Sequence, residues 1–318
     1  MHPALSVIFF TSLSGAGYGL LFWSALAALC NWMRTGPLLL TVVLGLVLVT
    51  IGLLSSLGHL GKPQRAWRSF SQWRTSWLSR EGVMAVATYV PALSLLALLL
   101  GNAIAAHSGA SVLHGSVPGV ASCVLLLVFA PLTVYCTAMI YASLPPIPAW
   151  RHAAVVPVYG LFALLTGGLL TAAVAALAGE GIDNRIAIAA VATAVVLAVA
   201  KWRYWRDIDA SPLPATRGDA VGLPGRNVSV FERPHTESNY LTREMGFVVA
   251  RKHARRLRTI ALVLFAVLPV LMVLPVWLFV HVDAAPWLTL AALSALLGAF
   301  VERWLFFAQA RHLVTLYY

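Results

Sequence analysis

Eight long stretches of predominantly apolar residues constrain this chain more than any other feature. They occupy residues 5–33, 38–58, 83–106, 117–143, 153–178, 185–204, 259–281 and 286–309. The hydrocarbon core of a bilayer needs about 20 such residues per helix, and backbone polar groups inside lipid are satisfied only in helices or closed barrels. The sequence therefore predicts an all-α integral membrane protein, a bundle of eight transmembrane helices.

The composition and the N-terminus agree with this fold. Of the 318 residues, 60% are hydrophobic and only 10% are charged, unlike a soluble domain. The first apolar stretch has no basic segment before it and is too long for a signal-peptide core, so we expect it to remain as the first span. We expect one membrane domain over residues 1–318, interrupted by one long hydrophilic loop at 205–258.

Proline and glycine residues within the spans suit helix kinks and close helix contacts. The prolines are Pro91, Pro131, Pro157, Pro269 and Pro275, and the glycines are Gly15, Gly17, Gly19, Gly167 and Gly168. Both features are more often a matter of packing than of function.

The cations are distributed very unevenly between the loops. Five follow the second span, one follows the fourth and twelve lie between Lys201 and Arg258, whereas the opposite loops hold only Arg34 and Arg185. The positive-inside rule then places the even-numbered loops and both termini in the cytoplasm. Because the net charge of +11 is confined to loops, we expect anionic lipid and an acidic protein surface as counterparts, not nucleic acid.

The hydrophilic loop divides into two parts. Residues 207–239 are rich in Pro, Gly and Asp and predict irregular structure. Residues 240–258 have a helix-forming, cationic composition and are expected to lead directly into span seven. This second part is expected to form a helix bound to anionic headgroups, to form a docking surface for a partner, or to do both.

One histidine stands at the end of a membrane-length run. His59 follows span two, at the expected membrane boundary, and histidine is the side chain that ordinarily titrates near neutral pH. Quinone chemistry needs such a group, because two electrons move with two protons and an imidazole can exchange a proton with the quinone oxygen. The alternative is a histidine that merely ends a helix, just as Arg65, Trp67, Trp73 and Trp77 are also suited to anchoring at the interface.

Four further ionisable residues lie in or beside spans. Glu302 and Arg303 are two turns inside the end of span eight, and as neighbours they point about 100° apart. Each is therefore expected to need its own partner, with a cation such as Arg80 available to Glu302. Arg80 and Glu81 open span three on the same face as His59. These groups form either structural ion pairs or a proton relay to a quinone pocket.

Metal-binding patterns are poorly supported. The three cysteines lie inside apolar runs without CxxC spacing, which disfavours disulfide scaffolds, zinc and cysteine-ligated clusters. Two histidines at matched depth, as a haem held between helices requires, are also not found. No metal or haem is expected in this chain, and a self-contained cytochrome b is disfavoured. A secondary transporter remains an alternative, weakened by the scarcity of polar groups at mid-membrane depth.

Four motifs in order resemble one known family over essentially the whole chain. They are MHPALSVIFFTSLSGAGYGL at the start, GHLGKPQRAWRSFSQWRTSWLSRE after span two, PHTESNYLTREMGFVVARKHARRLR before span seven and ERWLFFAQARH near the end. Together they look like the DmsC family of membrane anchors. The resemblance implies eight helices in a bacterial inner membrane, a molybdopterin catalytic subunit, a ferredoxin-like iron–sulfur subunit and a bound quinone or quinol.

The resemblance also implies roles for individual residues. His59 would lie at the quinone site, with Gly61, Arg65, Trp67 and Ser69 at the following motif positions; relatives vary at Trp67. Candidate site residues beyond the motif are Arg80, Glu81, Glu302 and Arg303. The basic segments would meet the iron–sulfur subunit through Lys62, Arg68, Arg74, Arg251, Lys252, Arg255 and Arg256.

Members of the family differ in substrate. Dimethyl sulfoxide reductases oxidise quinol, whereas similar cytoplasmic sulfite dehydrogenases reduce quinone with electrons from sulfite. The N-terminal motif looks more like the second group, and the cations place the docking face in the cytoplasm. We therefore expect an anchor that does not bind the sulfur substrate but takes part in the quinone half-reaction of sulfite oxidation.

Overall fold

The computed structural model describes residues 4–105, 116–180, 184–232, 253–279 and 281–317, apart from the side chains of residues 59, 105 and 184. Eight helices in this part of the chain are long and apolar enough to cross a bilayer, which confirms the predicted fold. Seven are continuous: α1 (Leu5–Cys30), α2 (Thr35–Ser56), α3 (Trp77–Ala105), α4 (Val117–Ala142), α5 (Val155–Leu177), α6 (Asn184–Ala210) and α12 (Ala284–Ala308). The remaining span joins α10 (Ala254–Leu262), the π-helical turn η4 (Val263–Val267) and α11 (Leu268–Leu278) end to end.

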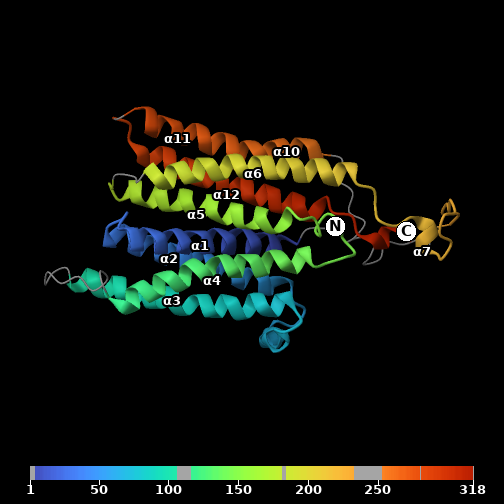
Figure 1. Ribbon diagram of the computed structural model, residues 1–318, viewed down its shortest axis with the longest axis horizontal. Coiled ribbons are helices and arrows are strands. Elements are labelled where there is room, and N and C mark those ends of the chain that lie inside the picture. Colours follow the sequence, from blue (N-terminus) through green and yellow to red (C-terminus); the bar gives the residue numbers. More distant parts are fainter. Residues whose placement is uncertain (1–3, 106–115, 181–183, 233–252, 280, 318) are drawn as a thin grey trace.

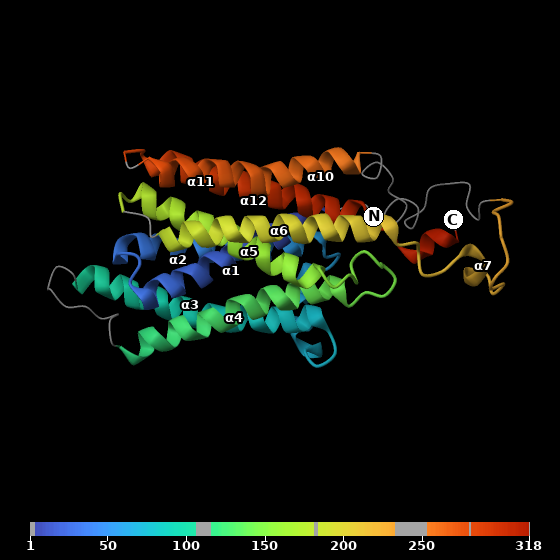
Figure 2. The same cartoon turned by 45° about the horizontal axis from the view of Figure 1, so that its top comes forward.

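The helices run side by side along the longest axis of the molecule (Figure 1). Helix α1 lies in the middle, where it contacts α2, α4, α5 and α12. Helix α3 packs on α4 and α2 at one side of the bundle, while α6, α10 and α11 cover the other side (Figure 2). Polar residues that α1 carries are therefore enclosed by helices on every side.

Glycines allow α1 to approach its neighbours closely. A Cβ atom on Gly19 would lie 1.8 Å from the carbonyl oxygen of Ala163 on α5, and one on Gly17 would lie 2.7 Å from the carbonyl oxygen of Gly45 on α2. Gly167 meets the backbone of Gly19 from the other side. The predicted role in close contact is confirmed for these three glycines, whereas a Cβ on Gly15 would meet nothing within 4 Å.

The π-helical turn in span seven has an identifiable partner on α12. Pro269 follows the turn and has no N–H to donate, so the regular hydrogen-bond ladder is interrupted here. The hydroxyl of Ser294 donates a hydrogen bond of 2.8 Å to the carbonyl of Leu264 within the turn. Gly298 lets the backbone of Phe265 come close, because a Cβ there would lie 2.5 Å from the Phe265 nitrogen.

Both labelled chain ends lie at one end of the bundle, together with α7 (Arg217–Ala220) and the connection between α2 and α3 (Figure 1). We call this the basic end. Between the end of α6 and residue 232 the only helix is α7, in agreement with the irregular structure predicted for this part of the hydrophilic loop. A capping box between Thr216 and Asp219 stabilises the start of this short helix. The hydrogen bonds that the Thr216 backbone and hydroxyl donate to the Asp219 carboxylate lower the pKa of Asp219.

Three helices extend furthest beyond the predicted spans. Helix α3 begins at Trp77 instead of residue 83, α6 continues to Ala210 instead of ending at 204, and α10 begins at Ala254 instead of 259. Charged and aromatic residues at the basic end extend these helices beyond their purely apolar stretches, because helix geometry tolerates them where the side chains reach the interface. As a result Arg80 and Glu81 lie within the first turns of α3, rather than before it.

Candidate functional site

The connection between α2 and α3 carries most of the predicted quinone-site residues. Two short 3₁₀ helices follow α2, η1 (Leu57–His59) and η2 (Pro63–Gln72). His59 is thus the last residue of η1, directly beyond the membrane helix, and its side chain lies outside the described part of the structure. Gly61 and Arg65 are exposed, and the Trp67 side chain is also exposed, as an interfacial residue would be.

Contacts with the start of α3 hold this segment in place. The Ser79 hydroxyl donates a hydrogen bond to the Ser69 carbonyl. The Arg80 guanidinium donates to the carbonyls of Trp73, at 3.0 Å, and Arg74, at 2.6 Å. It also lies over the Trp77 ring, 4.2 Å from the centroid. Arg80 therefore fixes the loop backbone, and the expected contact between Arg80 and Glu302 is wrong.

Glu81, the next residue, points into the protein. Its side chain is buried, and Oε1 has no hydrogen-bond partner among the described residues. A carboxyl group in this position can accept a proton on one oxygen and pass it on, which is the behaviour required beside a quinone.

Glu302 and Arg303 belong to a second cluster deeper in the bundle. Lys201 on α6 donates a hydrogen bond to Glu302 Oε1, and Arg303 Nη1 donates to Glu302 Oε2 at 3.1 Å. The two neighbours on α12 therefore contact each other, and the expectation that each needs a separate partner holds for Glu302, which Lys201 meets, but not for Arg303, whose carboxylate partner is Glu302 itself. The reason is that the long Arg303 side chain reaches around the helix to the Glu302 carboxylate.

Aromatic rings enclose the cations of this cluster. The Arg303 guanidinium lies 3.5 Å from the centroid of the Tyr159 ring and 5.1 Å from that of Phe162. The Lys201 ammonium lies 4.2 Å from the ring centroid of Tyr204 on its own helix. Rings that face a cation compensate part of the cost of removing it from water.

Lys201 is a functional candidate that the sequence pattern alone did not reveal, because it falls among the loop cations. It is 1% exposed, and α6 continues for nine residues beyond it. The available signal was its position within AVVLAVAKWRYW, where the apolar run precedes it and large aromatic residues follow. An ionisable residue inside a membrane span is a functional candidate by default.

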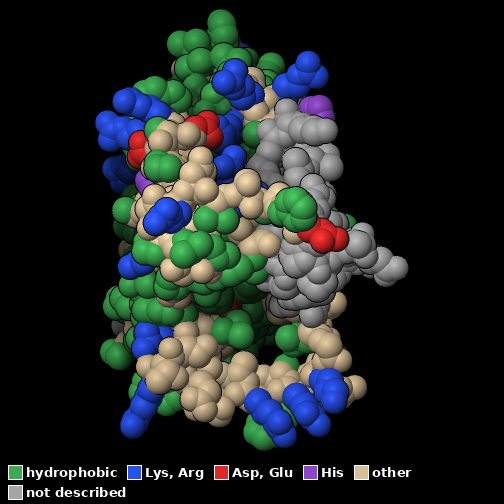
Figure 3. All heavy atoms as spheres, turned by 90° about the vertical axis from the view of Figure 1, so that its right-hand side faces the viewer, with side chains coloured by type: hydrophobic (Ala, Val, Ile, Leu, Met, Phe, Trp, Pro, Cys, Tyr) green, Lys and Arg blue, Asp and Glu red, His purple; other side chains and the backbone are tan. Residues whose placement is uncertain are grey.

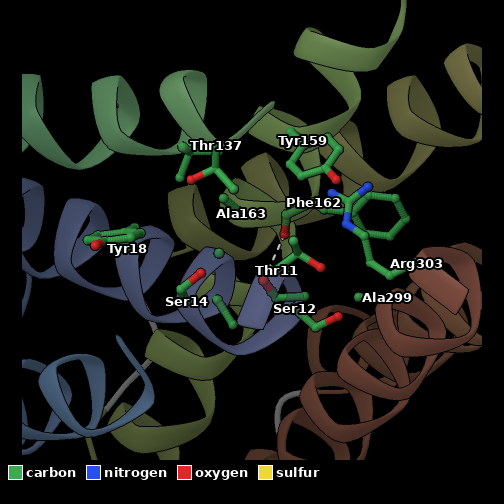
Figure 4. Close-up of a pocket in the computed structure, with 14 residues that line it drawn as sticks. Thr11, Ser12, Ser14, Tyr18, Thr137, Tyr159, Phe162, Ala163, Ala299 and Arg303 are labelled. Carbon is green, nitrogen blue, oxygen red and sulfur yellow. Dashed lines mark hydrogen bonds between the residues drawn. The ribbon is translucent and has the colours of Figure 1, made fainter. Parts of the chain in front are cut away.

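A small cavity lies beside this cluster at the centre of the bundle (Figure 4). Its volume is about 10 Å³, which is space for about one water molecule. Helix α1 contributes Ser12 and Tyr18, α5 contributes Tyr159, and α12 contributes Arg303. The hydroxyls of Ser12, Tyr18 and Tyr159 are buried without a hydrogen-bond partner among the described residues.

A larger pocket of about 370 Å³ opens at the basic end. His152 Nε2 lies 3.3 Å from Asp207 Oδ2 at its wall, and Arg258 makes two hydrogen bonds with Asp209, of 2.5 and 2.8 Å. Arg258 also donates to Gln309 Oε1 at 3.1 Å. The His152 ring is packed against Tyr204, with centroids 5.3 Å apart, so the pocket wall adjoins the ring that faces Lys201.

The predicted docking residues that the structure describes lie exposed at the basic end. Figure 3 looks onto this end, where Lys and Arg side chains gather at several places around the rim. The exposed members of the predicted set are Lys62, Arg68, Arg74, Arg255 and Arg256. Arg251 and Lys252 lie outside the described residues. The opposite end has Arg34, whose guanidinium pairs with Glu180 at 2.6 Å, and Arg185.

The two predicted groups of site residues therefore form two separate clusters. Ser69 and Arg80 make their hydrogen bonds at the start of α3, where Glu81 also lies, and Glu302 pairs with both Lys201 and Arg303. Within the described residues, no group of three or more His, Cys, Asp or Glu side chains is arranged to hold a metal ion. The chemistry that these clusters can support is the transfer of protons.

Comparison with known proteins gives two matches. A family model described as DMSO reductase anchor subunit (DmsC) matches residues 1–309. A sulfite dehydrogenase subunit from Allochromatium vinosum is 31% identical, and the match covers the whole of this chain and 99% of that protein. Both matches include the α2–α3 connection and α12.

Proposed function

This chain belongs to the DmsC family, the anchor subunits of DMSO reductase-type complexes, and we propose that it binds a quinone at the α2–α3 connection and passes electrons between it and an iron–sulfur partner. Anchor subunits serve catalytic and electron-transfer partner subunits in the membrane. The single observation that carries the proposal is the buried Glu81 carboxyl, with one oxygen free of partners among the described residues, beneath a loop that begins at His59.

The site has groups suited to each requirement of quinone chemistry. His59 and Glu81 exchange protons with the two quinone oxygens, and the charged Arg65 guanidinium, which does not lose its proton, donates hydrogen bonds to the quinone. Gly61 and Trp67 shape the loop at the depth of the lipid headgroups. Ser69 and Arg80 act as positioning residues, because their backbone and guanidinium contacts fix the loop on α3.

We further propose that the basic end docks a ferredoxin-like iron–sulfur subunit, which in turn holds a molybdopterin catalytic subunit. The exposed cations of η2 and α10 complement an acidic partner and orient it so that its last cluster lies near the quinone. Anionic lipid headgroups occupy the remaining cations. The positive-inside rule places this end and both termini in the cytoplasm of a bacterium.

The proposed direction of electron flow is from sulfite to quinone. The relative from Allochromatium vinosum is named as a sulfite dehydrogenase subunit, and a cytoplasmic docking face agrees with it. Oxidation of quinol by a dimethyl sulfoxide reductase is the alternative, which the same anchor geometry would serve. In either case the sulfur substrate is bound by another chain.

Purification of this chain from its native membranes in mild detergent tests the assembly. We expect a molybdopterin protein and a ferredoxin-like protein to accompany it, with molybdenum and iron detected by metal analysis. Assays of that complex with sulfite and with dimethyl sulfoxide then choose between the substrates. Recovery of the chain alone, without iron, contradicts the proposal and moves secondary transport, tested by substrate flux into liposomes, to first place.

The His59→Arg variant tests the quinone site. We expect it to abolish turnover with quinone while leaving assembly and turnover with an artificial dye acceptor intact, since the dye takes electrons from the partner subunits. His281→Arg is the matched control, because His281 is exposed beyond span seven at the opposite end of the bundle. Normal quinone turnover in His59→Arg removes His59 from the site.

A further inference from the structure

The pocket of about 370 Å³ at the basic end combines groups of both charges. It is lined by the end of α6, the start of α10 and the residues that follow α12. Four of its lining residues are Asp207, Asp209, Arg258 and Arg311, whose formal charges sum to zero. Concave sites of this size with a few convergent polar groups are where proteins hold small ligands.

Hydrogen-bond donors without an acceptor lie beyond the end of α12. Arg258 donates to Gln309 Oε1 at 3.1 Å, and a guanidinium has only donors, so the Gln309 amide turns its oxygen toward Arg258 and its NH₂ group elsewhere. Gln309 is 8% exposed, and its Nε2 has no hydrogen-bond partner among the described residues. Arg311 is exposed and makes no hydrogen bond or ion pair within that part of the chain. Both side chains are suited to a ligand with acceptor oxygens, such as a phosphate.

Asp207 supplies the opposite charge. The Nδ1 atom of His152 accepts a hydrogen bond of 3.1 Å from the Ala154 N–H, so the imidazole carries its proton on Nε2 and is neutral. Asp207 Oδ2 lies 3.3 Å from this Nε2, and the Asp207 side chain is 52% exposed. Asp209, in contrast, is occupied by the two hydrogen bonds from Arg258. Asp207 is therefore the carboxylate that can accept hydrogen bonds from a cationic group in the pocket.

The pocket lies where two outer helices separate. Helix α6 contacts η4 and α11 of span seven, whereas α10 packs on α12. In Figure 2 the α12 ribbon is visible between those of α6 and α10. The hydrogen bonds between Asp209 and Arg258 bridge the separated ends. The site thus lies beside the bundle surface, at the depth where apolar spans give way to charged residues.

The face of α6 that carries Asp209 continues as an apolar surface toward the middle of the membrane. Trp202 and Val195 precede Asp209 by seven and fourteen residues, and seven residues make nearly two helical turns, so the three side chains share one face. Trp202 is 57% exposed and Val195 is 53% exposed. In a bilayer these side chains contact lipid, with Trp202 near the level of the headgroups.

We propose that this pocket binds the headgroup of a zwitterionic phospholipid that carries a primary ammonium, a phosphoethanolamine lipid. The phosphate accepts hydrogen bonds from Arg311 and from the Gln309 amide, and the ammonium donates to the Asp207 carboxylate. An acyl chain lies along the α6 face of Trp202 and Val195. The inference does not depend on the proposed function, because it concerns only this chain and the bilayer.

Other phospholipids meet only part of this site. A phosphoglycerol headgroup has the phosphate but no cation for Asp207. A phosphocholine headgroup has both charges, but its trimethylated nitrogen has no N–H to donate. The chemistry of the headgroup is therefore the variable that tests the proposal.

The test measures lipid binding to the full chain, purified in mild detergent, by native mass spectrometry. Phosphoethanolamine, phosphocholine and phosphoglycerol lipids with identical acyl chains are added separately at equal concentrations. We expect the phosphoethanolamine lipid to bind at least about tenfold more tightly than the other two, the difference that one hydrogen bond to a charged group makes. Equal binding of the three lipids, or tighter binding of the phosphoglycerol lipid, overturns the proposal.

Two variants locate the site. Arg311→Gln removes the cation that faces the phosphate, and binding of the phosphoethanolamine and phosphocholine lipids should fall together. Asp207→Asn should abolish the preference between these two lipids. The controls are Arg203→Gln and Glu232→Gln, which change exposed charges outside the pocket lining and should bind like the wild type. If both pocket variants also bind like the wild type, the lipid lies elsewhere and the proposal is rejected.

A soluble headgroup separates the lipid from a free phosphate compound. Glycerophosphoethanolamine has the same charges and no acyl chains, and we expect it to bind at least about tenfold more weakly than the lipid, since each buried CH₂ contributes about 0.8 kcal/mol. If it displaces the lipid at equal concentration, the acyl chains contribute nothing and the assignment to a lipid is wrong. The comparison of headgroups on the wild-type chain remains decisive even where a variant fails to fold.

Discussion

The ammonium group of Lys201 on α6 meets the carboxylate of Glu302 on α12, 101 residues further along the chain, and both side chains are 1% exposed. Arg303 adds a second cation, so the cluster holds two positive charges and one negative charge inside the bundle. Buried charges are costly unless they are paired and hydrogen-bonded. Glu302 is the residue on which the pairing of both cations depends.

Removal of Glu302 should therefore destabilise the protein strongly. Glu302→Ala leaves Lys201 and Arg303 buried without their common partner, and we expect a loss of about 3–5 kcal/mol in the free energy of unfolding. Lys201→Met should lower the free energy of unfolding by less, because Glu302 remains paired with Arg303. Unfolding in detergent micelles measures the loss in both variants. Glu180→Gln, which removes the negative charge facing the exposed Arg34, is the control, with an expected change of about 0–1 kcal/mol.

A side chain at Gly19 should separate α1 from α5. In Gly19→Ala the new Cβ would lie 1.8 Å from the Ala163 carbonyl oxygen, which is backbone and cannot rotate away. Overpacking of this kind costs about 1–3 kcal/mol or more. The yield of folded protein and its melting temperature in detergent should both fall. Gly15→Ala is the control on the same helix, and equal losses in the two variants would contradict the packing argument.

Ser294→Ala should weaken the attachment of span seven to α12. The change removes the donor to the Leu264 carbonyl in the π-helical turn, and interhelical hydrogen bonds in membranes contribute about 0.6 kcal/mol on average. Amide hydrogen exchange around Val263–Val267 should increase. Thr289→Ala is the matched control, because Thr289 bonds to Ala285 of its own helix. If amide exchange around Val263–Val267 does not increase in Ser294→Ala, Ser294 is not the partner of the turn.

Charge reversal at Arg251, Lys252, Arg255 and Arg256 should weaken retention of the soluble subunits. The described members of this set are exposed on α10, and exposed charges act over about 8–10 Å at physiological salt. Release of the subunits from membranes is expected at a lower salt concentration than for the wild type. Charge reversal at Arg185, at the opposite end, is the control. Subunits that stay bound at moderate salt would make this stretch a lipid contact.

The membrane fold followed from the sequence because hydrophobic length alone fixes the number of spans. Close contact at Gly17 and Gly19 also followed, since small residues at this spacing have few other uses in a lipid environment. The helix ends did not follow. Trp77 and Arg80 extend α3 beyond its apolar stretch, where the contacts of Ser79 and Arg80 with the loop carbonyls hold the start of the helix.

The candidate site was predictable in part. His59, Glu81 and Glu302 stood out as ionisable residues at or within spans. Their partners could not be read from sequence, because Lys201 is 101 residues from Glu302 and falls among the loop cations. Tyr18 and Tyr159 gave no signal at all, since aromatic residues are ordinary in membrane helices and only their hydroxyls, unpartnered within the described residues, single them out.

The central place of α1 has a consequence for the making of the protein. The ribosome completes α1 first, yet α1 rests on α12, where Phe9 meets Phe300 with ring centroids 5.1 Å apart, and Arg303 of α12 lines the same cavity as Ser12. Until α12 has entered the bilayer, the polar face of α1 lacks its native cover. A chain cut short before α12 would therefore display that face to lipid and to membrane proteases, so biogenesis is complete only when the last helix has inserted.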